Sequence, residues 1–257
     1  MEKHEIKNLA RELYQELKRN NIEKFIEKLL KSLEKERTGK LKMAKTPVMN
    51  AIGKELGMLM MEDNDKFDKL LKLWKISFRD AKKGEFATTT GRELRYIVIN
   101  ALGSISKKEY ENSKKFVLGI LSDLCDWEMV DTLGLRVIVN LAKSNKEEIF
   151  STLEKWTSHK NKWVRRLSVA SLPPIIRSMP NEAENCLKII EKLMNEQDID
   201  VKKAVAWALR EISKRDPNAV YKFLTGYLDT INKDTLWIIR EGMKKLPPEL
   251  QRKLHVL

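Results

Sequence analysis

Apolar residues recur three or four positions apart along most of the chain, which is the spacing of a helix with one buried face. Residues 4 to 36 show this period with an interruption at Asn20-Asn21, so we predict a helical hairpin. Thr46-Pro47 then suits a helix start, because proline lacks the N–H group that the first turn leaves unpaired. That helix should end near Met61, and residues 63 to 78 form the next amphipathic segment.

Residues 82 to 91 have no apolar period and contain two glycines, which predicts a loop. We expect helices again over residues 92 to 102 and 109 to 124, separated by a break at Gly103-Ser104. No segment alternates apolar and polar residues for long enough to predict a strand. The pattern therefore indicates an all-α protein.

From Trp127 onward the predicted helices come in evenly spaced pairs. We expect them over residues 127 to 142, 145 to 157, 161 to 178, 181 to 195, 198 to 214, 217 to 229 and 231 to 244, with a short tail after Pro247-Pro248. Pro173-Pro174 falls inside the third of these helices, where missing N–H groups and ring clashes should kink or split it.

Four landmark residues lie 36, 38 and 36 positions apart: Trp127, Trp163, Val201 and Trp237. A period near forty with two helices per unit is typical of an α-solenoid of HEAT or armadillo repeats, since one helix pair cannot bury its own apolar face. Equivalent positions of successive inner helices would then line one concave wall. We expect Asp131, Arg166 and Trp207 to converge on it, within a single domain over residues 1 to 257.

The charge composition of the chain indicates which kind of molecule it binds. The chain carries 50 Lys and Arg residues against 37 Asp and Glu residues, a formal charge of +13, which favours a polyanion such as nucleic acid and predicts a basic concave groove. A solvated, lysine-rich surface of the thermophile kind explains the same number. Charge alone leaves both explanations open.

The cysteines and histidines argue against redox or metal chemistry. Cys125 and Cys186 lie in apolar helical contexts typical of small core residues in a reduced protein. His4, His159 and His255 are too scattered to predict a zinc site or a histidine-centred triad. We therefore expect no metal and no cofactor. The charged start and the absence of a long apolar run predict a cytoplasmic protein without a membrane span.

One carboxylate has a setting that suggests chemistry. Trp127 and Asp131 are four residues apart, so on a helix they share one face with Cβ atoms about 6 Å apart. A carboxylate facing DNA repels phosphates within a Debye length of about 8 Å, so it needs a cationic target. An alkylated purine nucleotide is one, because its base is positively charged and breaking its glycosidic bond develops positive charge on the sugar.

Asp131 would stabilise that charge and orient a water molecule, as carboxylates do in sugar hydrolysis. Trp127 and Trp207 would present indole faces to the sugar and base, and Arg165 or Arg166 would hold a phosphate. Each residue also has a structural explanation. The tryptophans could also be aromatic residues that pack in the core. Asp131 could be a solvated acid or could pair with an arginine, and the two arginines could lie on a solvated face. Periodicity does not decide between these explanations.

Three strings resemble the AlkD-like family of DNA alkylation repair glycosylases: DWEMVDTL at 126 to 133, KWVRRLSVASL at 162 to 172 and VKKAVAWALREISKRDPNAVYKFL at 201 to 224. The resemblance implies HEAT-like repeats and excision of positively charged alkylpurines such as 7-methylguanine and 3-methyladenine from duplex DNA. It also implies base excision repair of alkylation damage without a deep base pocket or a cofactor.

Carried over residue by residue, the resemblance implies that Asp131 is catalytic and that Trp127 and Trp207 frame the nucleotide. It assigns the DNA-holding arginine to Arg165 or Arg166, with Arg166 preferred. Further DNA contacts are expected at Lys45, Thr46, Lys162, Lys202, Lys203 and Arg210. The Thr46-Pro47 turn matches the family, although the glycine and arginine that usually accompany it are missing from residues 43 to 50.

The leading hypothesis is thus a monomeric, monofunctional glycosylase whose partner is double-stranded DNA carrying alkylated bases. A first rival is a non-catalytic HEAT-repeat protein that binds DNA structures, and a second is a protein-interaction scaffold whose charge only aids solubility. A helix-hairpin-helix glycosylase is disfavoured, because no paired-helix turn has the Gly-hydrophobic-Gly pattern of such proteins.

Overall fold

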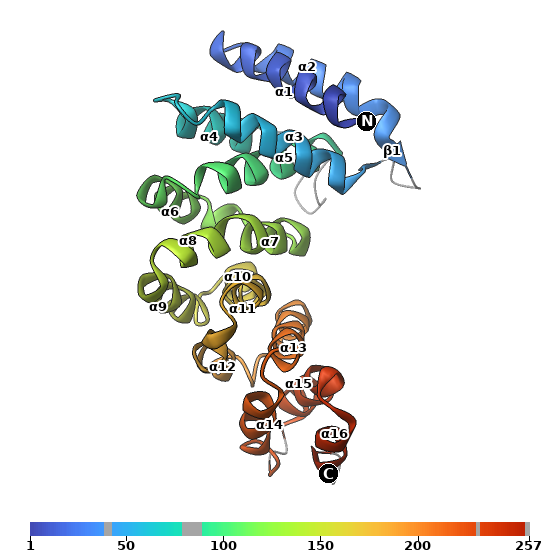
Figure 1. Ribbon diagram of the computed structural model, residues 1–257, viewed down its shortest axis with the longest axis vertical. Helices are drawn as coiled ribbons and strands as arrows, with labels where there is room; N and C mark the ends of the chain where they lie inside the picture. The colour runs from blue at the N-terminus through green and yellow to red at the C-terminus, as the bar shows by residue number, and fades with distance from the viewer. Residues whose placement is uncertain (39–42, 79–88, 230–231, 255–257) are drawn as a thin grey trace. The chain divides into compact units, whose positions relative to one another are not determined.

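The computed structural model describes residues 1–38, 43–78, 89–229 and 232–254 (Figure 1). Within these ranges the chain is helical apart from one pair of two-residue strands, so the all-α prediction is confirmed. The chain divides into two compact units, Met1–Ile120 and Leu121–Leu257. A single domain over the whole chain stays a prediction.

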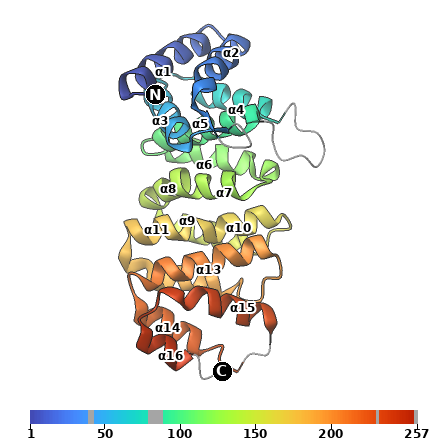
Figure 2. The same ribbon diagram turned by 90° about the vertical axis from the view of Figure 1, so that its right-hand side faces the viewer.

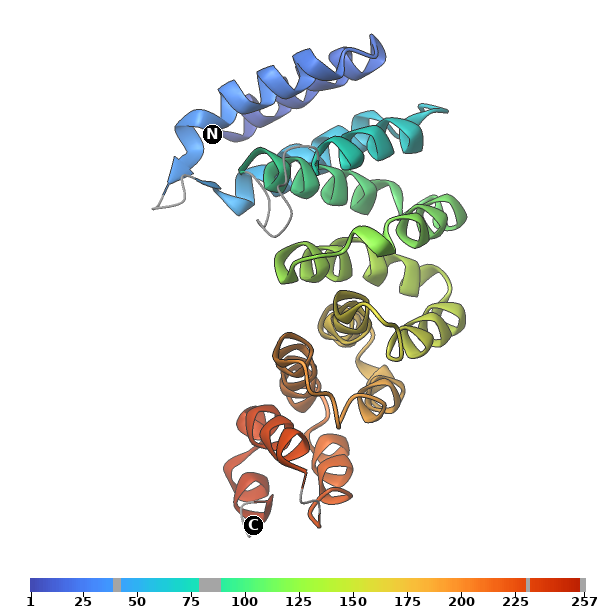
Figure 3. The ribbon, with the colours of Figure 1, turned by 180° about the vertical axis from the view of Figure 1, so that it is seen from behind.

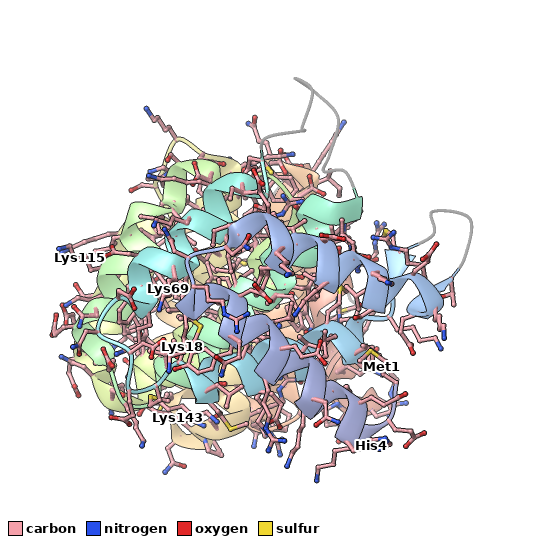
Figure 4. All side chains as sticks on the ribbon, turned by 90° about the horizontal axis from the view of Figure 1, so that it is seen from above. Met1, His4, Lys18, Lys69, Lys115 and Lys143 are labelled. Atoms are coloured by element: carbon pink, nitrogen blue, oxygen red, sulfur yellow. The ribbon has the colours of Figure 1, made fainter. Side chains whose placement is uncertain are left out.

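The first unit is built mainly of helices. Its helices are α1 (Lys3–Lys18), α2 (Ile22–Leu33), α3 (Thr46–Leu59), α4 (Lys66–Ile76), α5 (Thr89–Ile105) and α6 (Tyr110–Gly119). The predicted hairpin is present, and Asn20, with a φ of 55°, makes the left-handed turn between its helices. Helix α1 packs on α2 and α3, and α3 packs on α5 (Figure 3). His4 and Lys18 mark the two ends of α1 (Figure 4).

A short strand pair follows α2 and a 3₁₀ turn over Glu34–Glu36. Strand β1 (Arg37–Thr38) pairs antiparallel with β2 (Met43–Ala44), with Arg37 opposite Ala44. The fully buried carboxylate of Glu93 accepts hydrogen bonds from the Arg37 guanidinium at 3.1 and 2.8 Å and from the Ala44 amide at 3.3 Å. Two-residue strands are too short for an alternating pattern, which is why the sequence did not predict them.

Helix α5 departs from the prediction at both ends. It runs through Gly103-Ser104 to Ile105, so the predicted break between two helices is present but lies further along the chain, over residues 106 to 109. The buried Ser104 hydroxyl donates to the carbonyl of Asn100 in the preceding turn and to that of Lys54 on α3, which fastens the helix where glycine and serine suggested an end. Of the predicted loop 82–91, residues 82–88 lie outside the described residues, and the remainder begins α5.

The described residues of the second unit are also mainly helical. Its helices are α7 (Trp127–Leu133), α8 (Val139–Ser144), α9 (Lys146–Trp156), α10 (Lys162–Ala170), α11 (Leu172–Ser178), α12 (Ala183–Glu191), α13 (Ile199–Ser213), α14 (Pro217–Thr225), α15 (Lys233–Gly242) and α16 (Pro248–Leu254). Short 3₁₀ turns cover Leu121–Asp123, Pro180–Glu182 and Met243–Lys245. The tail expected after Pro247-Pro248 forms helix α16 over Pro248–Leu254. The predicted split at Pro173-Pro174 is confirmed, since α10 ends and α11 begins beside Ser171.

Helix α7 passes into α8 through a π-helical turn over Gly134–Ile138, within the predicted single helix 127 to 142. A Cβ atom on Gly134 would lie 3.0 Å from the Ser171 hydroxyl oxygen and 3.2 Å from the Ala170 carbonyl. The glycine therefore permits close approach of this turn to the junction of α10 and α11. Wider turns of this kind are rare and frequent at functional sites.

Helices α7, α10, α13 and α15 pack one against the next and are called the stacked helices below (Figure 2). Each begins at an Asp or Asn whose side chain caps the first turn: Asp126, Asn161, Asp198 and Asn232. Counted from these caps, the third, sixth and seventh residues of every stacked helix are buried. The caps thus define one common register for the four helices.

In this register the four sequence landmarks are not equivalent. Trp127, Trp163, Val201 and Trp237 are the first, second, third and fifth residues after their caps. The spacing near forty was sufficient to detect the repeat, but the aromatic residues do not mark one structural position.

None of the helices among the described residues combines the length and apolarity needed to cross a membrane. The described residues likewise contain no group of three or more His, Cys, Asp or Glu side chains arranged to bind a metal ion.

Candidate nucleic-acid interface

The first, fifth and ninth residues after each cap lie on one side of a stacked helix, away from the third, sixth and seventh residues. On α7 and the π-helical turn after it these are Trp127, Asp131 and Leu135; on α10, Lys162, Arg166 and Ala170; on α13, Ile199, Lys203 and Trp207; on α15, Lys233, Trp237 and Glu241. We call this set the wall. It combines aromatic, cationic and acidic groups, and it includes every residue that the resemblance assigned to the nucleotide.

Asp131 and Arg166 join two stacked helices across the wall. Arg166 donates from Nε to Oδ1 of Asp131 at 2.9 Å and from Nη2 to Oδ2 at 2.7 Å, the two-pronged geometry that makes arginine–carboxylate pairs strong. Its remaining Nη1 donates to the backbone carbonyl of Asp200 on α13. Arg166 therefore links α7, α10 and α13.

The pair is mostly withdrawn from solvent, with 8% of the Arg166 side chain and 21% of the Asp131 side chain exposed. Burial raises the pKa of the Asp131 carboxyl above its usual value, against the opposing effect of Arg166, and the nearby Asp126 raises it further. A carboxylate offers about four acceptor positions and Arg166 uses two. Asp131 can therefore still accept a hydrogen bond from a water molecule.

Trp127 precedes Asp131 by one helical turn and is 56% exposed. It is the first residue of α7, after Asp126, whose side chain accepts a hydrogen bond from the Met129 amide at 2.7 Å. Trp207 lies one turn beyond Lys203 on α13 and is half-buried. Neither indole is sealed in the core, in contrast to Trp74, which is fully buried.

Several of the expected DNA contacts have partners within the protein. The Lys162 ammonium lies 2.8 Å from the Asp200 carboxylate and 3.2 Å from that of Asp198. Lys202 lies 2.5 Å from Asp234. These lysines tie α10 to α13 and α13 to α15, a role that their sequence positions did not reveal.

Two expected arginines are also held within the protein. Arg165 pairs with Glu196 at 2.7 Å, and the Arg210 guanidinium donates to the Glu241 carbonyl at 3.1 Å. Lys203, by contrast, is exposed and makes no ion pair with any residue that the structure describes. Of the predicted phosphate contacts on the stacked helices, Lys203 is thus the most available.

Lys45 and Thr46 belong to the other compact unit. Lys45 lies 3.7 Å from Glu36, and the Thr46 hydroxyl accepts a hydrogen bond from Arg92 at 3.4 Å. Their part in DNA binding stays a prediction.

The sequence interpretation missed the Asp200 carbonyl, the lysine–aspartate ties and the place of Trp237 on the wall. Aligning the chain on its Asp and Asn caps would have put Trp237 in register with Asp131, Arg166 and Lys203. No comparable signal exists for a backbone carbonyl.

A family model described as DNA alkylation repair enzyme matches residues 44–246, which include all the stacked helices. The crystal structure of AlkD2 from Streptococcus mutans has the same fold, with a TM-score of 0.61 and 18% identity over 86% of this chain and 99% of that chain. AlkC from Pseudomonas fluorescens, bound to DNA containing an abasic site analogue, is similar with a TM-score of 0.54 and 16% identity, over 79% of this chain and 53% of that chain.

A sequence relative is the uncharacterized protein YhaZ of Bacillus subtilis (strain 168). It is 33% identical over 108 residues, which are 40% of this chain and 30% of YhaZ. The match thus spans less than a third of that relative. The two solved structures share the fold of this chain.

Proposed function

Because this chain belongs to the DNA alkylation repair enzyme family, we propose that it is a monofunctional DNA glycosylase acting on duplex DNA. Its substrates are purines that carry a positive charge after alkylation at N3 or N7, such as 3-methyladenine and 7-methylguanine, and its product is an abasic site. The observation that carries the proposal is the carboxylate of Asp131, held by Arg166 one helical turn from the exposed Trp127.

Breaking the glycosidic bond of a cationic purine places positive charge on the deoxyribose. Asp131 is already ionised and oriented in a site of reduced water content, so it stabilises this charge without a reorganisation cost at the moment of reaction. One of its free acceptor positions orients the attacking water. The departing base leaves as a neutral purine, so the leaving group needs no acid.

Trp127 and Trp207 present indole faces to the sugar and the cationic base, each contributing about 0.5 to 2 kcal/mol. Arg166 keeps Asp131 in place, and its position on the wall lets it approach a phosphate of the same strand. Lys203 supplies a second phosphate contact. The protein acts in the cytoplasm as a monomer and needs neither a metal nor a cofactor for this chemistry.

The test is release of 7-methylguanine from methylated duplex DNA under single-turnover conditions, with Asp131→Asn beside the wild type. The variant should release no base above the uncatalysed rate while binding DNA as well as or better than the wild type, because a negative charge is removed. Glu128→Gln on the same helix loses the same charge and should stay active. Undiminished release by Asp131→Asn would refute the assignment.

The pairing of Asp131 with Arg166 also fits a non-catalytic DNA-binding protein, in which the carboxylate only orients the arginine. That alternative predicts DNA binding with a steep salt dependence and no base release by the wild type. The same assay therefore decides between the two functions.

A further inference from the structure

Trp237 is the fifth residue after the Asn232 cap of α15, in register with Asp131, Arg166 and Lys203 on the other stacked helices. It is half-buried, whereas the core positions of the same helix are occupied by the buried residues Thr235, Ile238 and Ile239. Trp237 is therefore not needed to fill the core of α15, and it belongs to the wall.

The indole of Trp237 is held from one side by a neighbouring helix. The Lys202 ammonium on α13 lies 5.4 Å from the ring centroid and 2.5 Å from the Asp234 carboxylate. Lys202 is mostly buried, so this contact is shielded from solvent and fixes the ring more firmly than a surface pair would. A fixed aromatic side chain loses little entropy when a ligand packs against it.

The surroundings of Trp237 favour an anionic partner. Lys233 and Arg240 are exposed on the same helix, and the Arg240 guanidinium lies 3.8 Å from the Glu241 carboxylate. Of the acids nearby, Asp234 is neutralised by Lys202, and the Glu241 carboxylate lies 2.5 Å from the Lys244 ammonium. The exposed Lys233, which makes no ion pair with any described residue, thus remains available for a phosphate.

We propose that Trp237 is a further DNA contact, which packs against the sugar–phosphate backbone several nucleotides from the lesion. This inference rests on the proposed function. Stacked helices lie about 8 to 10 Å apart, and a DNA strand advances about 3.4 Å per nucleotide. One helix step therefore corresponds to about two or three nucleotides, and Trp237, two helices beyond Arg166, meets the strand about five or six nucleotides away from it.

The proposal predicts that binding affinity depends on the length of the duplex on one side of the lesion only. The probe is a duplex with a central non-hydrolysable abasic site analogue, in which either flank is shortened in steps from about ten to about three base pairs. The wild type should lose affinity when one particular flank falls below about five base pairs. Trp237→Ala should bind the long duplex on the order of tenfold more weakly and the short duplex as well as the wild type.

Two controls separate this contact from general effects. Leu236→Ala removes a neighbouring exposed apolar side chain and should leave the length dependence unchanged. Trp237→Phe retains a ring and should keep most of the affinity for the long duplex. If Trp237→Ala weakened binding equally to duplexes of every length, or did not weaken binding to any of them, the inference would be wrong. The proposed function would be unaffected by either result.

A measurement on the unsubstituted protein covers the case in which Trp237→Ala fails to fold. Hydroxyl-radical oxidation read by mass spectrometry should show Trp237 protected by the long duplex and unprotected by the duplex with the short flank. Trp127 should be protected by both. Equal oxidation of Trp237 with and without the long duplex would overturn the inference. Failure of the wild type to bind any of these duplexes would instead remove the proposed function itself.

Discussion

Arg166 and Asp131 are bound to each other through two hydrogen bonds, although they lie 35 positions apart on different helices. The Nη1 group of Arg166 donates to the Asp200 carbonyl, so each of the three guanidinium nitrogens donates one hydrogen bond within the protein. The carboxylate therefore has a fixed position in the protein without DNA. A side chain fixed in this way suits electrostatic stabilisation better than a mobile one.

Arg166→Ala should destabilise the protein, because it leaves the largely buried Asp131 without its cation. We expect the free energy of unfolding to fall by about 2 to 3 kcal/mol, somewhat less than for a fully enclosed pair. Base release should be lost as well. Arg166→Lys keeps the charge but not the two-pronged geometry, and should recover stability more than activity. Urea unfolding beside the base-release assay measures both effects, and an Arg166→Ala variant of unchanged stability would contradict this account.

The raised pKa of Asp131 predicts a pH effect on activity. Only the ionised carboxylate stabilises positive charge, so enzyme-catalysed base release should rise as pH increases through the raised pKa, above the ordinary aspartate value of about 3.9. The measurement is the single-turnover rate against pH after subtraction of uncatalysed release. An acid limb at or below the ordinary aspartate value would argue against the burial of this group.

The raised pKa of Asp131 also makes stability depend on pH, but stability falls with rising pH whereas activity rises. A carboxyl whose pKa is higher in the folded state binds its proton more tightly there, so its contribution to the free energy of unfolding falls as pH rises from the unfolded-state pKa through the folded-state pKa. Relative to Asp131→Asn, the wild type should therefore be most stable at the acid end of this window. Thermal unfolding of both proteins across the window measures the difference, and a difference that grew with pH would show that Arg166 dominates over burial.

The features that could be predicted from the sequence are local. Helix periods come from neighbouring residues, and the four-residue spacing of Trp127 and Asp131 is enough to put both side chains on one face of α7. The bond of Lys162 to Asp198 and Asp200 is non-local, because it depends on how α10 packs against α13. Composition counts such a lysine as a free positive charge, and only the packing shows that it is paired.

The predicted break at Gly103-Ser104 was misplaced for a related reason. A glycine followed by serine commonly ends a helix in isolation, yet the Ser104 hydroxyl bonds the carbonyl of Lys54 on a different helix. Tertiary contacts therefore extend α5 beyond its local signal. The turn at Gly134 likewise became apparent only from its contact with Ser171.

Lys203 and Lys162 should respond differently to substitution by alanine, although both were expected to contact DNA. Lys203 is exposed and unpaired among the described residues, so Lys203→Ala should weaken DNA binding and reduce the slope of log affinity against log salt concentration by about 1. Lys162→Ala should leave that slope nearly unchanged and lower stability instead, because it leaves Asp198 and Asp200 unpaired. Fluorescence anisotropy at several salt concentrations makes the comparison, and equal slopes for the two variants would contradict it.

Trp127 offers the sharpest separation of function from folding. Its side chain is 56% exposed, so little apolar area is lost from the core when it is removed, and Trp127→Ala should change the free energy of unfolding by less than about 1 kcal/mol. If the indole faces the sugar and the cationic base, the same variant should slow base release by roughly two- to thirtyfold, which corresponds to about 0.5 to 2 kcal/mol. Trp74→Ala, which empties a fully buried site, should show the reverse pattern of large destabilisation. A Trp127→Ala variant with unchanged base release would show that this exposed ring does not meet the substrate, because its exposure leaves no loss of folding to explain a change in rate.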